Sequence, residues 1–550
     1  MTSSIKPKDW LAAIVAIVLL LAAITPTLGL LEFSGGSENL VVATALETKR
    51  SGEWIEPTLN NEPRTKKPPL PMWMTALVIS DQTLLSLNNP DRLARETAYA
   101  RLAWHVRLTL VPVIFVTLIG IFALARELGA TQSQAISAIL VCGSTLLFLR
   151  FARSATTDAH LLMWTTLTTL ACFRGLSRRS LVWAMVAGLC AGAAFMCKGP
   201  LIVVQSILPV AICCVWFRLA RPRTVAVFAM FGSFIVVAVP WYVVVAVRNP
   251  DVLSTWFTEV HRAGATPLPA DSIFTYLLMV VLVFPWTVFF VIGLIDAGRK
   301  VRDRSSQNWP AIALITLIVP MLVMTFFPDR KDRYLLPMIV PAALLCVHGV
   351  TLLLANAGRF SKQDRVVLVL HWAGLLVAAG ALTYESRLWW TVSMSALVGV
   401  VLLTLVLAGE RLSKRRPNLL IASTTITFFA MFIVLLMGYR TTREGRSELK
   451  PLADAIWSIA PGARVVHVNP EGLFLGPNDL AIYLNRPIEI YKQLSEVNAL
   501  TAENVVLVLH QTRNSSIPSP QGWRVIASVP RDRDYYWAFV PDDVRQRDDR

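Results

Sequence analysis

Long apolar stretches recur along most of the chain and are separated by short polar segments. A helix needs about 20 apolar residues to cross the hydrocarbon core of a bilayer. Such windows lie at about residues 11–31, 107–125, 132–149, 158–173, 181–197, 200–217, 224–247, 273–297, 309–327, 334–355, 367–384, 389–408 and 418–438. The pattern predicts a polytopic α-helical membrane protein with about thirteen transmembrane helices.

The first apolar stretch could be a signal peptide or a permanent helix. It follows Lys6 and Lys8, is longer than a typical signal-peptide core and has no clear small-residue cleavage site. We therefore expect a retained first transmembrane helix.

The composition agrees with a membrane protein. The 550 residues are 55% hydrophobic and only 16% charged, whereas a soluble domain would carry about a quarter of charged residues. The net charge of +16 would suggest nucleic acid in a soluble protein. Here the cations gather in loops between apolar stretches, so we expect them to fix topology rather than to bind nucleic acid.

Basic clusters occupy alternate loops, which gives the chain a predicted orientation. If the N-terminus is cytoplasmic, the inner loops hold Arg174, Arg178, Arg179, Arg218, Arg221, Arg223, Arg299, Lys300, Arg302, Arg304, Arg359, Lys362, Arg365, Arg411, Lys414, Arg415 and Arg416. This is the distribution that the positive-inside rule describes. An odd number of spans then places the C-terminus outside the cytoplasm.

The chain becomes soluble in character after about residue 440. "ELKPLADAIWSI" and "GPNDLAIYL" have helical apolar spacing, while "ARVVHV", "ENVVLVLH", "WRVIASV" and "YYWAFV" predict strands. We therefore expect a transmembrane domain over 1–440, with a large outer loop at 32–106, and a small extracytoplasmic α/β domain over 441–550. The latter has no Gly-rich phosphate loop, metal cluster or catalytic triad.

The cysteines and histidines carry no visible metal site. All seven cysteines lie in apolar segments without ligand spacing, so neither a structural zinc site nor a disulfide framework is expected. His348 and His371 lie in or beside apolar spans, and His467 and His510 in predicted strands without partners. No cofactor is certain, although a divalent cation stays open.

Ionisable residues near the predicted outer boundary are candidates for function, because such groups are costly in a membrane. They are Glu38, Lys66, Lys67, Arg153, Asp158, Lys198, Glu259, His261, Arg262, Arg330, Lys331, Asp332, Arg333 and Tyr334. Several cations with a few carboxylates suit an anionic lipid headgroup and a leaving phosphate. The alternative is that some cations only reach toward lipid headgroups.

A short interfacial helix is predicted just after the first span. "GGSENLVVATALETKRSGEW" places Leu40, Val41, Ala45 and Leu46 on one face. Glu38 lies near its start, where the helix dipole favours an anion. Glu38 is therefore either a functional acid or a capping carboxylate.

The outer loop resembles that of a known family. "SENLVVATALETKRSGEWIEPTLNNEPRTKKPPLPMWMTAL" is similar to the first outer loop of GT-C glycosyltransferases of the protein-mannosyltransferase-like class, especially bacterial aminoarabinose (ArnT-type) transferases. Gly52-Glu53-Trp54, Pro57, Lys67-Pro68 and Trp73 match the family pattern in order and spacing. Two positions depart from it, since Ser37 replaces the first acid of an Asp-Glu pair and Lys66 replaces the acid before Lys67.

The resemblance extends over about residues 10–440. "RSATTDAHLLMW" resembles the segment of a second family acid at Asp158, and "AAFMCKGPLIVV" resembles a Lys-Gly turn at Lys198. "FTEVHRAG" brings Arg262 close to a loop arginine of the family, and "DRKDRYLLPMIVP" resembles the segment that contains Arg333 and Tyr334. The family implies a GT-C fold in the bacterial inner membrane.

The resemblance also implies a reaction. Such enzymes transfer a sugar from a polyprenyl-phosphate carrier to an acceptor on the outer face, and the phosphate is already a good leaving group. Catalysis then needs cations where negative charge grows, a base near the acceptor hydroxyl and close orientation of both substrates.

Each candidate residue receives an expected role. We expect Lys67, Lys198, Arg262 and Arg333 to hold the carrier phosphate, Tyr334 to hydrogen-bond it, and Lys66 to add a cation. Asp158 or Glu38 is the expected base or orienting acid. The four prolines in "NNEPRTKKPPLPMW" restrict the backbone that presents Lys67.

The expected partners are an undecaprenyl-phosphate-linked sugar, membrane lipids and an acceptor that is a lipid A-like lipid, a polysaccharide or a protein. Two other functions stay open. A lipid or sugar transporter would carry charged or broken spans at mid-membrane, which are scarce here. A non-catalytic lipid-phosphate-binding relative is suggested by Ser37 and Lys66.

Overall fold

The computed structural model describes most of the chain. The described residues are 7–33, 35–219, 222–265, 274–303, 308–327, 330–355, 361–386, 417–439, 447–468, 477–498, 504–512, 520–531 and 534–542. The predicted span at 389–408 lies outside these residues, as does the side chain of Arg262.

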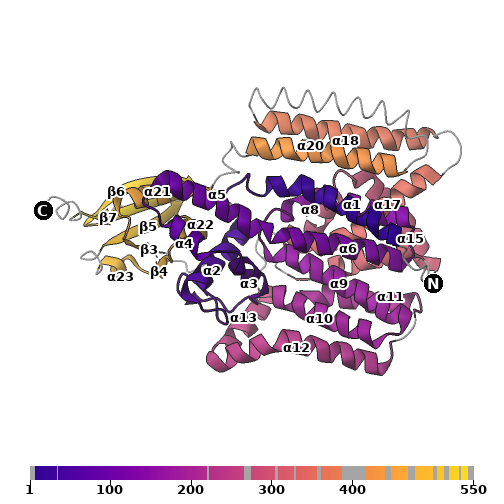
Figure 1. The fold of residues 1–550 in the computed structure, drawn as a ribbon, viewed down its shortest axis with the longest axis horizontal. Coiled ribbons are helices and arrows are strands. Elements are labelled where there is room, and N and C mark those ends of the chain that lie inside the picture. Colours follow the sequence, from indigo (N-terminus) through magenta and orange to yellow (C-terminus); the bar gives the residue numbers. More distant parts are fainter. Residues whose placement is uncertain are drawn as a thin grey trace. The chain divides into compact units, whose positions relative to one another are not determined.

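The chain forms two compact units, drawn together in Figure 1. The helical unit contains residues 1–27, 66–70 and 110–438. The loop–sheet unit contains residues 28–65, 71–109 and 439–550. The segment after residue 440 thus shares a unit with most of the long first loop. That loop was expected to belong to the transmembrane domain. The domain boundary near residue 440 stays a prediction.

The helical unit is built almost entirely of helices. They are α1 (Pro7–Ile24), η1 (Thr25–Thr27), α6 (Leu110–Leu128), α7 (Gln132–Gly143), α8 (Leu146–Phe151), α9 (Thr157–Arg178), α10 (Leu181–Lys198), the π-helical η2 (Val203–Ile207), α11 (Leu208–Trp216), α12 (Thr224–Arg248), α13 (Val252–Ala265), η3 (Thr275–Leu278), α14 (Met279–Leu282), α15 (Thr287–Lys300), η4 (Val301–Asp303), α16 (Trp309–Thr325), η5 (Asp332–Met338), α17 (Ile339–Ala355), α18 (Lys362–Ser386) and α20 (Pro417–Tyr439).

Glycines allow two pairs of helices to pack closely. A Cβ added at Gly188 of α10 would lie 2.0 Å from the carbonyl oxygen of Met230 in α12. Gly293 of α15 and Gly349 of α17 face each other, and a Cβ at either would lie 2.0 Å from a carbonyl oxygen of the other helix. Small residues at such crossings are typical of packed membrane helices.

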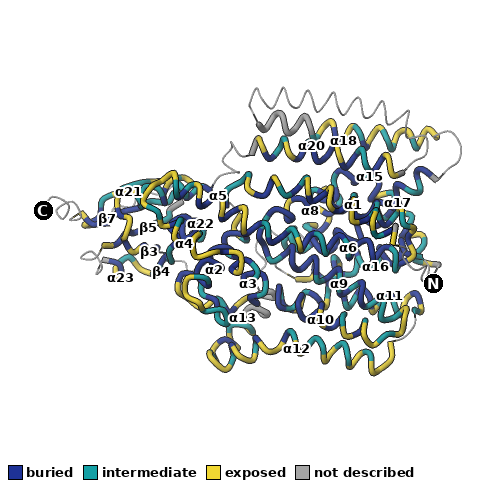
Figure 2. The backbone as a smooth tube through the Cα atoms, in the orientation of Figure 1, coloured by how far each residue is buried: buried dark blue, intermediate teal, exposed yellow. Residues whose placement is uncertain are grey.

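Six helices in the described part of the chain are long and apolar enough to cross a membrane, or seven if a bent pair counts as one span. These helices place the protein among multi-pass membrane proteins, while the count of about thirteen stays a prediction. The bent pair, Thr275–Leu282 and Thr287–Lys300, turns by 117° within the predicted span 273–297. α12 is the most exposed of the six, and Figure 2 shows much of its length in yellow.

The loop–sheet unit combines short helices with a five-stranded sheet. Its elements are α2 (Gly36–Ser51), β1 (Thr58–Leu59), β2 (Glu62–Pro63), α3 (Leu70–Leu77), α4 (Asp81–Leu87), α5 (Arg92–Leu108), α21 (Lys450–Ile459), β3 (Arg464–Val468), α22 (Asn478–Leu484), β4 (Glu489–Tyr491), α23 (Leu494–Asn498), β5 (Val505–Thr512), β6 (Trp523–Arg531) and β7 (Asp534–Pro541). The sheet order is β4-β3-β5-β7-β6.

The sheet is mixed and has its own core. β3 pairs in parallel with β4 and β5, whereas β7 pairs antiparallel with β5 and β6. Val466, Leu507, Trp523 and Phe539 are buried together on it. The strands β3, β5, β6 and β7 and the helices α21 and α22 confirm the corresponding sequence predictions. β4 and α23 were not predicted.

The helix expected after the first span is α2. It begins at Gly36 with Glu38 in its first turn and ends at Ser51, before Gly52, which has φ +74°. Because only glycine adopts this left-handed conformation at little cost, Gly52 suits the end of the helix. Val41, Ala45 and Leu46 are buried and Leu40 is half-buried, but every residue from Val41 to Thr48 is buried. The helix is therefore covered on all sides along this stretch, and the prediction of a single buried apolar face was wrong.

Candidate functional site

Asp158 and Lys198 form the centre of the candidate site in the helical unit. Asp158 lies in the first turn of α9 and Lys198 is the last residue of α10, where Gly199 with φ +66° turns the chain. The ammonium of Lys198 donates a hydrogen bond to Oδ1 of Asp158. Their side chains are 9% and 2% exposed. Each of these buried charges is stabilised by the other, because an unpaired buried charge is costly.

Tyr334 lies against this ion pair. The Nζ of Lys198 is 4.5 Å from the centroid of the Tyr334 ring, close enough for a cation–π contact. The guanidinium of Arg333 is 5.8 Å from the same centroid. Gln205 of η2 donates a hydrogen bond of 3.2 Å to the carbonyl oxygen of Tyr334. Gln205 was not among the predicted residues, and as a neutral side chain in an apolar span it gives little signal.

Cations outnumber acids around Lys198. Arg333 and Lys67 both lie near enough to interact with Lys198 electrostatically. Lys67 is exposed, whereas Pro68 and Pro69 after it are buried, so the backbone beside the lysine is anchored. The structure therefore brings together Asp158, Lys198, Arg333, Tyr334 and Lys67, five of the eight predicted residues.

The other predicted residues have different positions. Lys66 is exposed and precedes Lys67 in the chain. Arg262 belongs to α13, and the structure does not describe its side chain. Glu38 belongs to α2 of the loop–sheet unit.

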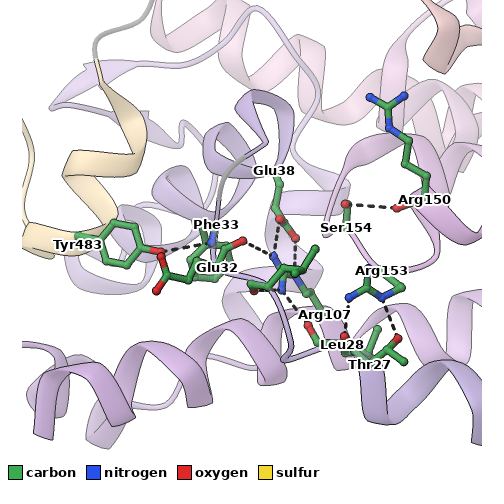
Figure 3. Close-up of polar contacts among 11 residues, drawn as sticks. Thr27, Leu28, Glu32, Phe33, Glu38, Arg107, Arg150, Arg153, Ser154 and Tyr483 are labelled. Atoms are coloured by element: carbon green, nitrogen blue, oxygen red, sulfur yellow. Dashed lines mark hydrogen bonds and ion pairs between the residues drawn. The ribbon is translucent and has the colours of Figure 1, made fainter. Parts of the chain in front are cut away.

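Glu38 is tied to Arg107 of α5. Nε and one Nη of Arg107 each donate a 2.8 Å hydrogen bond to a different carboxylate oxygen of Glu38 (Figure 3). The same guanidinium donates to the carbonyl oxygens of Leu28, Leu31 and Glu32. Both side chains are buried, at 4% and 3% exposure. This geometry fastens the segment after α1 to α5 and supports a structural role for Glu38.

Arg107 was not singled out in the sequence, although a signal exists. It is a cation at the beginning of a predicted apolar span, a position where such residues are usually paired or functional. Arg153, which was a candidate, is also buried and donates to the hydroxyl and carbonyl oxygens of Thr27 at 2.8 and 2.6 Å (Figure 3). It thereby holds η1, which follows α1, within the helical unit.

The described residues do not favour a resident metal ion. They contain no group of three His, Cys, Asp or Glu side chains that could hold one. Asp158 is paired with a lysine rather than with a second acid. The chemistry that the site can supply is therefore positive charge beside one buried carboxylate, which suits a phosphate group.

The fold is similar to that of a solved membrane protein. It matches the crystal structure of ArnT from Cupriavidus metallidurans in the apo state with a TM-score of 0.70 at 19% identity, over 96% of this chain and 98% of the other. The same protein bound to undecaprenyl phosphate gives a TM-score of 0.68 over 97% and 98%. The chain therefore has the GT-C fold of ArnT, which confirms the fold expected from the sequence resemblance.

The sequence comparisons lead to the same class. Residues 99–244 match the family model of dolichyl-phosphate-mannose-protein mannosyltransferases. The undecaprenyl phosphate-α-4-amino-4-deoxy-L-arabinose arabinosyl transferase of Photorhabdus laumondii is 24% identical over 317 residues, which are 54% of this chain and 52% of that protein. The match thus spans about half the length of this curated relative. This protein is ArnT-like in sequence and in fold.

Proposed function

We propose that the protein is a membrane glycosyltransferase that uses a polyprenyl-phosphate-linked sugar, with undecaprenyl phosphate as the carrier. The observation that carries this proposal is the site in which Lys198, paired with Asp158, lies against Tyr334 with Arg333 and Lys67 nearby. The undecaprenyl phosphate bound to the similar ArnT structure supports the choice of carrier.

The cations of the site would act on the leaving phosphate, whereas the carboxylate would act on the acceptor. Lys67, Lys198 and Arg333 would stabilise the negative charge that grows on the phosphate as the sugar leaves. Tyr334 would donate a hydrogen bond to it, and Arg262 and Lys66 would add charge at its edge. In such enzymes the carrier phosphate is a good leaving group and needs no dedicated general acid. Positive charge around this phosphate is therefore the principal requirement for catalysis.

Asp158 would act on the acceptor. A buried carboxylate that is kept ionised by Lys198 can take a proton from an acceptor hydroxyl or orient that hydroxyl for attack. When phosphate binds, Lys198 would share its hydrogen bonds between the phosphate and Asp158. Glu38 is the second candidate for the base, but its two hydrogen bonds from Arg107 favour a structural role.

The orientation follows from the basic loops. We propose a multi-pass protein of the bacterial inner membrane with about thirteen transmembrane helices and a cytoplasmic N-terminus. The residues after about 440 would lie outside the cytoplasm, as an extracytoplasmic α/β domain together with the first loop. The candidate site would then face the same side of the membrane.

A labelled donor tests this function against its alternatives. The purified protein is incubated with a panel of undecaprenyl-phosphate sugars and with lipid A-like, polysaccharide and protein acceptors. Sugar transferred to an acceptor supports the transferase and identifies both substrates. Binding without turnover would contradict it and indicate a lipid-phosphate-binding protein, whereas movement of intact donor across a vesicle membrane would indicate a transporter.

A further inference from the structure

The loop–sheet unit contains a large cavity that the proposed catalytic residues do not line. Its volume is about 720 Å³, within the range of about 300–1,000 Å³ that is usual for small-molecule sites. Its walls are the segment 29–33, one face of α5, the beginning of α21 and Tyr483 of α22. All lining residues belong to the loop–sheet unit.

Charged side chains of both signs line this cavity. Arg92 and Glu96 lie one helical turn apart on α5, and Nη2 of Arg92 is 3.3 Å from Oδ2 of Asp454 on α21. Across the cavity lining, Nζ of Lys450 donates a 2.7 Å hydrogen bond to Glu32. These are three carboxylates and two cations, so the lining has a small excess of negative charge.

The carboxylates of Glu32 and Asp454 are held by polar contacts but stay partly exposed to the cavity. Glu32 also accepts a 2.8 Å hydrogen bond from the backbone N–H of Ser447, and the Phe33 N–H beside it donates to the hydroxyl of Tyr483 at 3.3 Å (Figure 3). Glu32 and Asp454 keep 31% and 23% of their side-chain surface exposed. Burial raises the pKa of the Asp454 carboxyl, which means that water solvates this group poorly. A polar ligand would therefore replace solvation that the carboxylate lacks.

We propose that this cavity binds an uncharged or amine-bearing saccharide of about two sugar rings, the sugar portion of the acceptor. Sugar hydroxyls donate to carboxylates and accept from arginine and lysine at the same time, so a lining of alternating acids and cations suits them. The excess of carboxylates favours an amino group over an acidic one. This inference rests on the proposed transferase function, because it assigns the saccharide to the acceptor.

The lining disfavours two other ligands. A phosphate or sulfate would meet three carboxylates against two cations that are already paired. A metal ion would need its acids gathered together, and the described residues contain no group of three potential ligands.

Direct binding tests the inference. Isothermal titration calorimetry on the purified full-length protein would use the β-1,4-linked disaccharide of glucosamine, neutral cellobiose and a disaccharide that contains glucuronic acid. We expect the amine-bearing disaccharide to bind tightest and the acidic one weakest. The double variant Glu96→Gln/Asp454→Asn should weaken binding of the amine-bearing disaccharide about tenfold or more, since it removes two charged partners.

Two further variants make the result specific. Ala100→Trp fills the cavity from an exposed lining position without changing any charge, and should also abolish binding. Glu489→Gln removes an acid that pairs with Arg464 in the same unit but does not line the cavity, and should keep wild-type affinity. An equal loss in Glu489→Gln, or unchanged affinity in both cavity variants, overturns the inference.

Release of undecaprenyl phosphate from the donor, measured with the lipid A-like, polysaccharide and protein acceptors present but without the test disaccharides, separates this inference from the proposed function. Release by a wild-type protein that binds none of the disaccharides overturns the saccharide cavity and leaves the transferase intact. Saccharide binding without release from any donor overturns the acceptor assignment, because the transferase function itself has then failed.

Discussion

Lys198 donates a hydrogen bond to Asp158 although the two residues lie 40 positions apart in the chain. The contact joins the last residue of α10 to the first turn of α9. Asp158 lies where the positive end of the α9 dipole stabilises an anion, and Lys198 where the negative end of the α10 dipole stabilises a cation. The helices therefore support both charges of the pair that we place at the centre of the site.

Replacing Lys198 by methionine should remove donor turnover. The change keeps the length of the side chain but leaves Asp158 buried without its ammonium, and we expect release of undecaprenyl phosphate to fall about a hundredfold or more. It should also lower the thermal stability, whereas the double variant Lys198→Met/Asp158→Asn should recover part of the stability and none of the activity. Wild-type release by Lys198→Met would contradict the proposed phosphate site.

The Glu38–Arg107 pair should matter for stability more than for chemistry. Arg107→Met leaves the Glu38 carboxylate buried without the guanidinium that pairs with it. Such a loss typically costs about 3–5 kcal/mol of stability. Hydrogen exchange in α2 should report the loss, and Arg107→Lys should restore little because lysine lacks the planar fork. If Glu38→Gln abolishes donor release while the protection of α2 stays unchanged, Glu38 is the base after all.

The close crossing of α15 and α17 should not tolerate a larger residue. A side chain at Gly293 would meet the carbonyl oxygen of Leu345, so Gly293→Ala forces the helices apart and should destabilise the protein by about 1–3 kcal/mol or more. Gly232→Ala is the matched control, since nothing lies within 4 Å of an added Cβ there. Thermal unfolding in the same detergent compares the two variants, and equal melting temperatures would refute the packing argument.

The sheet of the loop–sheet unit should weaken in mild acid. Burial lowers the pKa of His467 on β3 to about 4, helped by the neighbouring His510. The unfolded chain binds a proton near pH 6.5 while the folded sheet does not, so stability is present above pH 6.5 and is lost as the pH falls toward 4.

The loss should reach up to about 3 kcal/mol and is measurable as faster hydrogen exchange in β3. His467→Leu removes this titration and should flatten the profile between pH 6.5 and 4. A steep profile that persists in the variant would assign the effect to another group.

The sequence predicted elements where local pattern determines structure. The helix α2 follows from helical spacing, and the strands β3 and β5 follow from short apolar runs that are bounded by polar residues. Four of the five residues of β3 are buried, as such a run predicts. The three-residue strand β4 was missed because it is too short to show a pattern. The windows 132–149 and 273–297 were each expected to be one span, but helices end at Gly143 and Leu282, before the Ser144–Thr145 turn and Pro285. Serine, threonine and proline favour such breaks.

The candidate site was also predictable only in part from the sequence. Asp158, Lys198 and Tyr334 could be named because their motifs resemble a family, but periodicity says nothing about which of these side chains meet. The partner of Glu38 was not foreseen, since Arg107 lies 69 positions away and the pairing depends on the tertiary fold that brings the end of α5 to the beginning of α2. Long-range pairs of this kind are set by tertiary packing rather than by local sequence.

The most direct test of the account is release of undecaprenyl phosphate, in the presence of the lipid A-like, polysaccharide and protein acceptors, by purified wild-type protein, Asp158→Asn and Asp296→Asn. Asp296 is the matched control, because it also pairs with a lysine, Lys300, at 2.8 Å in the helical unit but lies outside the proposed site. We expect release from at least one undecaprenyl-phosphate sugar by the wild type and by Asp296→Asn, and loss of release in Asp158→Asn. Release by all three proteins at the same rate, or by none from any donor, would contradict the account.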